Sequence, residues 1–125
     1  ACVGCAGCIA VCPVGAIVND WGGSHFKEKI TEYAYGAQLG KEIVYISFLI
    51  NITPECDCMG QHMDTVAEDI GVFASTDPVA IDSACLDMLQ RESGECLFND
   101  GRASIVHAVS IGFGTDQYEL IEIEA

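Results

Sequence analysis

The apolar positions between residues 24 and 40 repeat with the period of an α-helix. They recur every three or four residues and so share one helix face: Phe26, Ile30, Tyr33, Ala34 and Ala37. Ser24 is a residue type that caps helix N-termini, and Gly40 is one that ends helices. The pattern predicts a helix over residues 25–39.

Two later segments have the apolar, β-branched composition of buried strands. The first, EIVYISFLINI, occupies residues 42–52 and leads into the turn-forming sequence TPECDCMG at 53–60. The second, DIGVFAS, occupies residues 69–75. Because both segments are almost continuously apolar, we expect strands that are covered on both faces.

The clearest helix signal follows the second strand. Asp77 is a favourable N-cap, Pro78 suits the first helical position, and Gly94 ends the pattern. Between them one apolar stripe runs along the predicted helix: Ile81, Ala84, Cys85, Met88 and Leu89. We therefore interpret Cys85 as a core residue, Asp77 as a cap and Asp82 as a solvated helix residue.

The end of the chain predicts a shorter helix near residues 103–111 and a final strand, YELIEIE, at 118–124. Strands that alternate with helices are typical of an α/β fold, and an α+β arrangement is compatible with the same elements. We predict a compact α/β layer over residues 24–125, preceded by a small Cys-rich segment at 1–23 that ends in the turn-forming, hinge-like sequence NDWGG.

Charge and hydropathy exclude several classes of partner. Five Lys and Arg residues against nineteen Asp and Glu residues give a net charge of −14, which repels nucleic acid and anionic membrane surfaces. The longest apolar run, at 43–50, is far shorter than the roughly 20 residues that span a bilayer. A protein partner would present a basic face. With no secretory signal visible, we expect a cytoplasmic protein, and the start at Ala1 suggests a fragment or processed product.

The first segment carries the most specific motif in the chain. Its cysteines, spaced C-x2-C-x2-C-x3-C and followed by Pro13, have the spacing that bacterial ferredoxins use to hold cubane iron–sulfur clusters: Cys2, Cys5, Cys8 and Cys12. Small neighbours such as Gly4 and Gly7 let the backbone wrap a bulky inorganic core and direct its N–H groups at sulfur. The motif predicts one 4Fe-4S cluster, or two in a longer protein.

Two other uses of these thiols compete with a cluster. A disulfide framework would need an oxidising compartment, and thiols separated by two residues make strained pairs. A structural zinc site usually takes two C-x2-C pairs separated by a longer spacer. The observed spacing fits neither alternative well.

The ligand set of the cluster stays open at this point. In two-cluster ferredoxins, cysteines equivalent to Cys2, Cys5 and Cys8 hold one cluster, and the equivalent of Cys12 holds the other. The chain has no second copy of the motif. The remaining ligands therefore come either from sequence upstream of Ala1 or from further along the chain.

Later cysteines give weaker signals. Cys56 and Cys58 are two residues apart, so an extended backbone would point both thiols to the same side, as for a metal or a vicinal redox pair. Asp57 between them disfavours a free thiolate, and ligation is the better functional interpretation. Two surface thiols without a role is the alternative. His62 is the one histidine near this loop, and Cys96 has no partner at readable spacing.

Four segments together resemble a family of uncharacterised iron–sulfur centre proteins, in which a domain of unknown function is joined to bacterial ferredoxin-type motifs: CVGCAGCIAVCPVGAI, FKEKITEYAYG, YISFLINITPECDC and DIGVFASTDPVAIDSACLDM. The similarity runs from Cys2 to about Leu120 and corresponds to the C-terminal part of that family. It implies cluster binding at the first four cysteines, assigns Cys56 and Cys58 to a characteristic loop, and supplies no reaction.

These observations favour low-potential electron transfer as part of a larger redox protein. The alternatives are the redox half of an uncharacterised iron–sulfur enzyme, with Asp77, Asp82 and the C-x-C loop lining its site, and a structural zinc or other metal module. No phosphate-binding loop or dinucleotide fingerprint is present. The sequence names no substrate, redox partner protein or oligomeric state.

Overall fold

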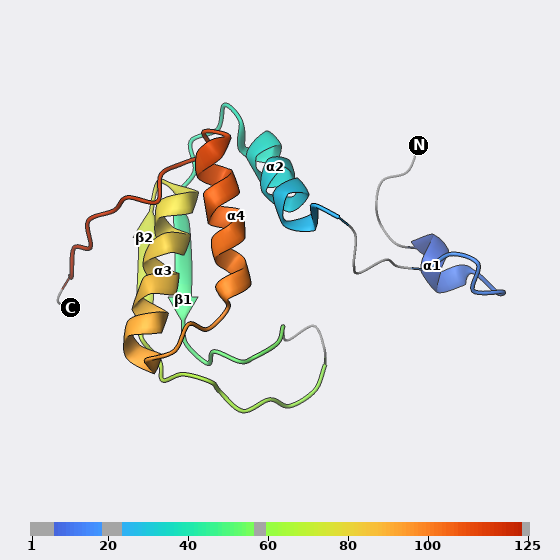
Figure 1. Ribbon diagram of the computed structural model, residues 1–125, viewed down its shortest axis with the longest axis horizontal. Coiled ribbons are helices and arrows are strands. Elements are labelled where there is room, and N and C mark those ends of the chain that lie inside the picture. Colours follow the sequence, from blue (N-terminus) through green and yellow to red (C-terminus); the bar gives the residue numbers. More distant parts are fainter. Residues whose placement is uncertain (1–6, 19–23, 57–59, 124–125) are drawn as a thin grey trace.

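The computed structural model describes residues 7–18, 24–56 and 60–123. Within these ranges the chain forms four helices and one small sheet, and is therefore a mixed helix-and-strand protein (Figure 1). The elements follow in the order α1 (Gly7–Val11), α2 (Phe26–Gln38), β1 (Tyr45–Leu49), β2 (Gly71–Ser75), α3 (Pro78–Ser93) and α4 (Asn99–Ser110).

The sheet consists of β1 and β2 paired antiparallel, with Tyr45 opposite Ser75 and Leu49 opposite Gly71. An irregular connection, not a helix, joins the strands in the described parts of 50–70. Antiparallel strands need no crossover helix, whereas parallel strands do. The prediction of strands alternating with helices is therefore wrong at this point, and the arrangement is α+β.

One face of the sheet is covered and the other is open. Helix α3 packs against both strands, while α4 packs against α3 and α2 packs against α4 (Figure 1). On the opposite face, Ile46, Phe48 and Val72 are each at least 60% exposed. The expectation of strands covered on both faces is wrong in the described residues, because all the helices that pack against the sheet or against one another lie in layers on one side.

Helix α3 begins and ends as its sequence predicts. The carboxylate oxygen Oδ1 of Asp77 accepts the backbone N–H groups of Val79 at 2.8 Å and Ala80 at 3.0 Å. At the other end, Gly94 takes a left-handed conformation with φ of 72°. Asp77 is confirmed as the cap, and Pro78 occupies the first helical position.

Three predicted boundaries need correction. Ser24 does not cap α2, because His25 intervenes in a left-handed conformation and makes no side-chain cap hydrogen bond. Helix α4 begins at Asn99, before the expected residue 103. Residues 118–123 are not a strand, since they pair with neither β1 nor β2. Instead, the Tyr118 hydroxyl donates to the carboxylate of Asp87 on α3 at 2.8 Å.

The core lies between α3 and α4. Val79 packs with Ile105 and Ala108, and Leu86 and Phe113 close the edge of this cluster. Helix α2 is attached to α4 through two polar pairs, Lys27 with Asp100 at 2.8 Å and Glu32 with His107 at 3.1 Å. The stripe predicted for α3 is confirmed as its buried face, with Leu89 only 4% exposed.

Candidate functional site

The thiol segment, residues 7–18, is built differently from the rest of the described chain. Helix α1 is five residues long and has no buried side chain, and Val11 and Val14 are more than three-quarters exposed. In the described part of the chain, α1 packs against no other helix or strand (Figure 1). Apolar burial therefore contributes little to the order of this segment.

Within the thiol segment, backbone N–H groups donate to the sulfur and to the carbonyl oxygen of one cysteine. The N–H of Ala16 donates to Sγ of Cys12 at 3.2 Å, and the N–H of Gly15 donates to the carbonyl oxygen of Cys12 at 3.3 Å. Backbone N–H groups of Ile17, Val14 and Ala16, in that order, hold the pKa of the Cys12 thiol below its usual value.

This environment favours a thiolate, which is the form that binds metals. Hydrogen bonds from backbone N–H groups to ligating sulfurs also tune iron–sulfur clusters. Cys8 is an exposed free thiol one helical turn before Cys12. Cys8 and Cys12 are thus donors of the kind that iron–sulfur clusters take. The predicted ligands Cys2 and Cys5 lie outside the described residues, as does the NDWGG segment.

The second predicted ligand group is only partly described. Cys56 is exposed in the connection between the strands, and Cys58 and Asp57 lie outside the described residues. His62 lies 3.8 Å from Asp64, and both side chains are almost fully exposed. Across residues 7–18, 24–56 and 60–123, no three His, Cys, Asp or Glu side chains gather as a metal-binding set.

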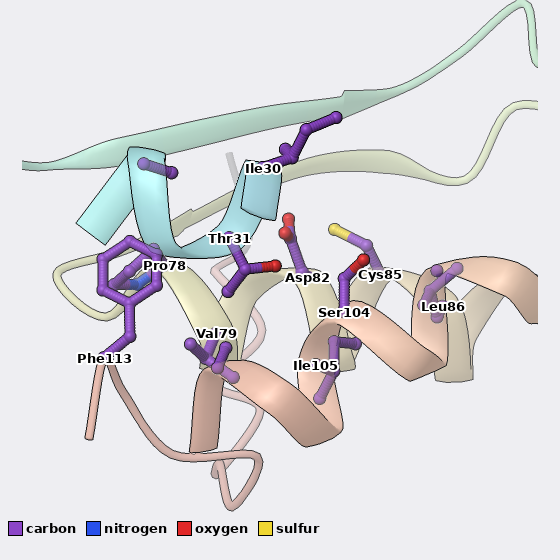
Figure 2. A pocket seen from close by; sticks show the side chains of 13 residues that line it. Ile30, Thr31, Pro78, Val79, Asp82, Cys85, Leu86, Ser104, Ile105 and Phe113 are labelled. Carbon is purple, nitrogen blue, oxygen red and sulfur yellow. The ribbon is translucent and has the colours of Figure 1, made fainter. Parts of the chain in front are cut away.

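A cavity of about 430 Å³ lies between α2, α3 and α4 (Figure 2). Its walls are mainly apolar, and the polar groups on them come from Asp82, Cys85, Ser104 and Thr31. Partial loss of hydration beside the apolar walls raises the pKa of the Asp82 carboxyl, although the residue is exposed. Burial raises the pKa of the Cys85 thiol. A hydrogen bond with Ser47 lowers this pKa by less, and the negative charge of Asp82 raises it further.

Sequence reasoning missed this cavity. The interpretation of Asp82 as a solvated helix residue is confirmed, because the residue is exposed, whereas Cys85 is only partly buried and is not plain core. Both side chains point into the cavity from α3 (Figure 2). The available signal was their spacing, because residues three apart on a helix share a face. Asp82 therefore lies on the same side of α3 as Cys85, at the edge of the apolar stripe. Asp77, the other acid proposed for a site, is used by the helix cap and by the N–H of Thr115 at 3.1 Å.

The fold and its exposed thiols define a small α+β protein with a Cys-bearing N-terminal segment. Residues 3–87 match a family described as a domain of unknown function (DUF362), and the chain belongs to this family. No curated protein and no solved structure matches it. Among the described helices, none has the length and apolar character needed to cross a bilayer.

Proposed function

We propose that this chain binds a 4Fe-4S cluster and acts in low-potential electron transfer as part of a larger redox protein. The observation that carries the proposal is the convergence of backbone N–H groups on Cys12, inside a motif whose four cysteines have ferredoxin spacing. Such a site favours thiolate sulfur before any metal arrives.

The proposed ligands are Cys2, Cys5 and Cys8 for one cluster, with Cys12 completing it or serving a second one. When bound, the cluster supplies one-electron redox chemistry. The residues of this chain hold it, direct N–H groups at sulfur and set the surrounding charge. Since α1 buries no side chain, ligation orders this segment in our proposal, as in other small metal-dependent segments.

The low potential follows from charge. Adding an electron to a cluster is disfavoured by nearby negative charge, and the chain carries a net charge of −14. A redox partner would present basic residues. The cytoplasm is the proposed compartment, because thiols there are kept reduced and available for iron.

Metal analysis of anaerobically purified protein tests cluster binding. We expect iron and acid-labile sulfide in equal amounts in the unaltered chain, and loss of most of both in Cys8→Ser. The matched control is Cys96→Ser, which removes another exposed thiol outside the thiol segment. Zinc in place of iron, or equal iron in the two variants, would contradict the proposal.

The redox role has a separate test. The midpoint potential of the iron-loaded protein is expected well below 0 mV, and raising the salt concentration should shift it upwards because salt screens the acidic surface. A potential above 0 mV would remove the electron-transfer role proposed here, while leaving cluster binding itself standing.

A further inference from the structure

The cavity between α2, α3 and α4 has the size and wall chemistry of a ligand site. Its volume of about 430 Å³ falls within the range of small-molecule pockets. Most of its surface is apolar, with contributions from Ile30 on α2, Val79 and Leu86 on α3, and Ile105 on α4. The proposed cluster ligands belong to another part of the chain, so the role of this cavity is a separate question.

One carboxylate of the cavity is left without a partner. Asp82 points from α3 toward α2 across the cavity (Figure 2). It makes no hydrogen bond or ion pair with any residue that the structure describes. Other acids near α3 are used: Asp77 caps the helix, and Asp87 pairs with Arg102 at 2.8 Å. Because Asp82 is exposed, its carboxylate is open to a ligand that enters the cavity.

The protein supplies no cation to this carboxylate. The chain has only five basic residues, and all of them lie in described positions away from the cavity walls. Lys27 pairs with Asp100, and Lys29 and Lys41 donate to backbone carbonyl oxygens of their own region. Arg102 donates to Asp87 and Gln90. Arg91 does not line the cavity. A positive charge placed beside Asp82 would therefore belong to a ligand.

We propose that this cavity binds a small amine in its protonated form, with the ammonium group at Asp82 and the hydrocarbon body against the apolar walls. The thiol of Cys85 and the hydroxyl of Ser104 lie beside Asp82 and offer further hydrogen-bond acceptors (Figure 2). An anionic ligand of the same shape is excluded by the carboxylate and by the net charge of −14.

The test compares two probes with the same body, 2-phenylethylammonium and 2-phenylethanol, by amide chemical shifts of the full ¹⁵N-labelled chain. The ammonium is expected to bind more tightly than the alcohol and to shift amides of α2, α3 and α4 around the cavity. In Asp82→Asn, we expect the ammonium to bind about fivefold to tenfold more weakly while the alcohol is unchanged. The matched control, Glu92→Gln, removes an equal charge from an exposed position of α3 and should change neither.

Three outcomes would overturn the assignment. Equal binding of the two probes would remove the role of the carboxylate. Equal weakening by Asp82→Asn and Glu92→Gln would indicate a general attraction to the acidic surface. Ser104→Leu adds apolar volume to the cavity wall and should block both probes. Unchanged binding in this variant, with the folded state verified by circular dichroism, would place the probes elsewhere.

Discussion

The cysteine side chain has opposite pKa shifts in two regions of the molecule: the thiol segment, and the body that α2, β1, β2, α3 and α4 form. In the thiol segment, hydrogen bonds from backbone N–H groups lower the pKa of Cys12. In the body, burial on α3 raises the pKa of Cys85. In the thiol segment, backbone hydrogen-bond donors set the surroundings of the thiol, and α1 stays unburied. In the body, packed side chains set them. The pKa shifts favour the thiolate in the first region and the protonated thiol in the second.

The largest expected effect is a loss of stability on substitution in the core of the body. Leu89→Ala removes a side chain that is only 4% exposed and should destabilise the body by about 2–5 kcal/mol in urea unfolding. Leu120→Ala, at a position that is half exposed, serves as the control and should change the unfolding free energy little. If both variants unfold at the same urea concentration, the packing assigned to α3 is wrong.

A smaller effect is expected at the start of α3. Asp77→Ala leaves three backbone N–H groups without their acceptor, those of Val79, Ala80 and Thr115. The expected loss is about 1–2 kcal/mol in the same unfolding experiment. Asp77→Ser keeps an N-cap oxygen and should recover part of that loss. No recovery would indicate that the carboxylate acts through something other than the helix cap.

Thiol alkylation compares the two regions directly. In metal-free, reduced protein, iodoacetamide should modify Cys12 faster than Cys85, and the rate at Cys12 should level off at a lower pH. Mass spectrometry of peptides, sampled over time between pH 6 and 10, gives both profiles. Cys96, which is exposed and lies outside the thiol segment, is the reference. A Cys12 profile identical to that of Cys96 would mean that its N–H groups have no effect.

The smallest expected effects on stability come from two acidic residues on α3 whose pKa values are shifted in opposite directions. Partial desolvation raises the pKa of Asp82, so its contribution to stability is complete below the ordinary carboxyl pKa of about 3.9 and is lost as pH rises through the folded value. For Asp87, partial burial acts to raise the pKa, but hydrogen bonds from Arg102 and Tyr118 outweigh it and lower the value. Its contribution is present above pH 3.9 and is lost as pH falls through the folded value.

These signs predict opposite responses to neutralisation. At pH 7, Asp82→Asn should stabilise the chain slightly, and Asp87→Asn should destabilise it slightly. Thermal unfolding of both variants at pH 7 and pH 3 measures the difference, which should shrink at the lower pH. Destabilisation by both substitutions at pH 7 would contradict the environment described for Asp82.

The sequence predicted elements that are determined by local signals. Asp77, Pro78 and Gly94 delimit α3 correctly, and the period of its apolar residues identifies its buried face. The helix at 25–39 is found within one residue at each end. Caps and helical periods depend on neighbours in the sequence, so they can be read without knowing the fold.

Features that depend on distant contacts were not predictable in the same way. Continuous apolar character at Ile46, Phe48 and Val72 indicated strands covered on both faces, yet burial is set by where helices pack and not by composition. The segment at 118–123 had strand composition but finds no strand to pair with. Likewise, the cavity at Asp82 and Cys85 exists only because three helices meet there.

The measurement that tests the central claim most directly is electron paramagnetic resonance of the anaerobically purified chain after reduction with dithionite. We expect a low-temperature signal of a reduced 4Fe-4S cluster, present in the unaltered chain and in Cys96→Ser and lost in Cys8→Ser. A chain without such a signal before and after reduction, colourless and free of iron when prepared without oxygen, would contradict the account of the thiol segment.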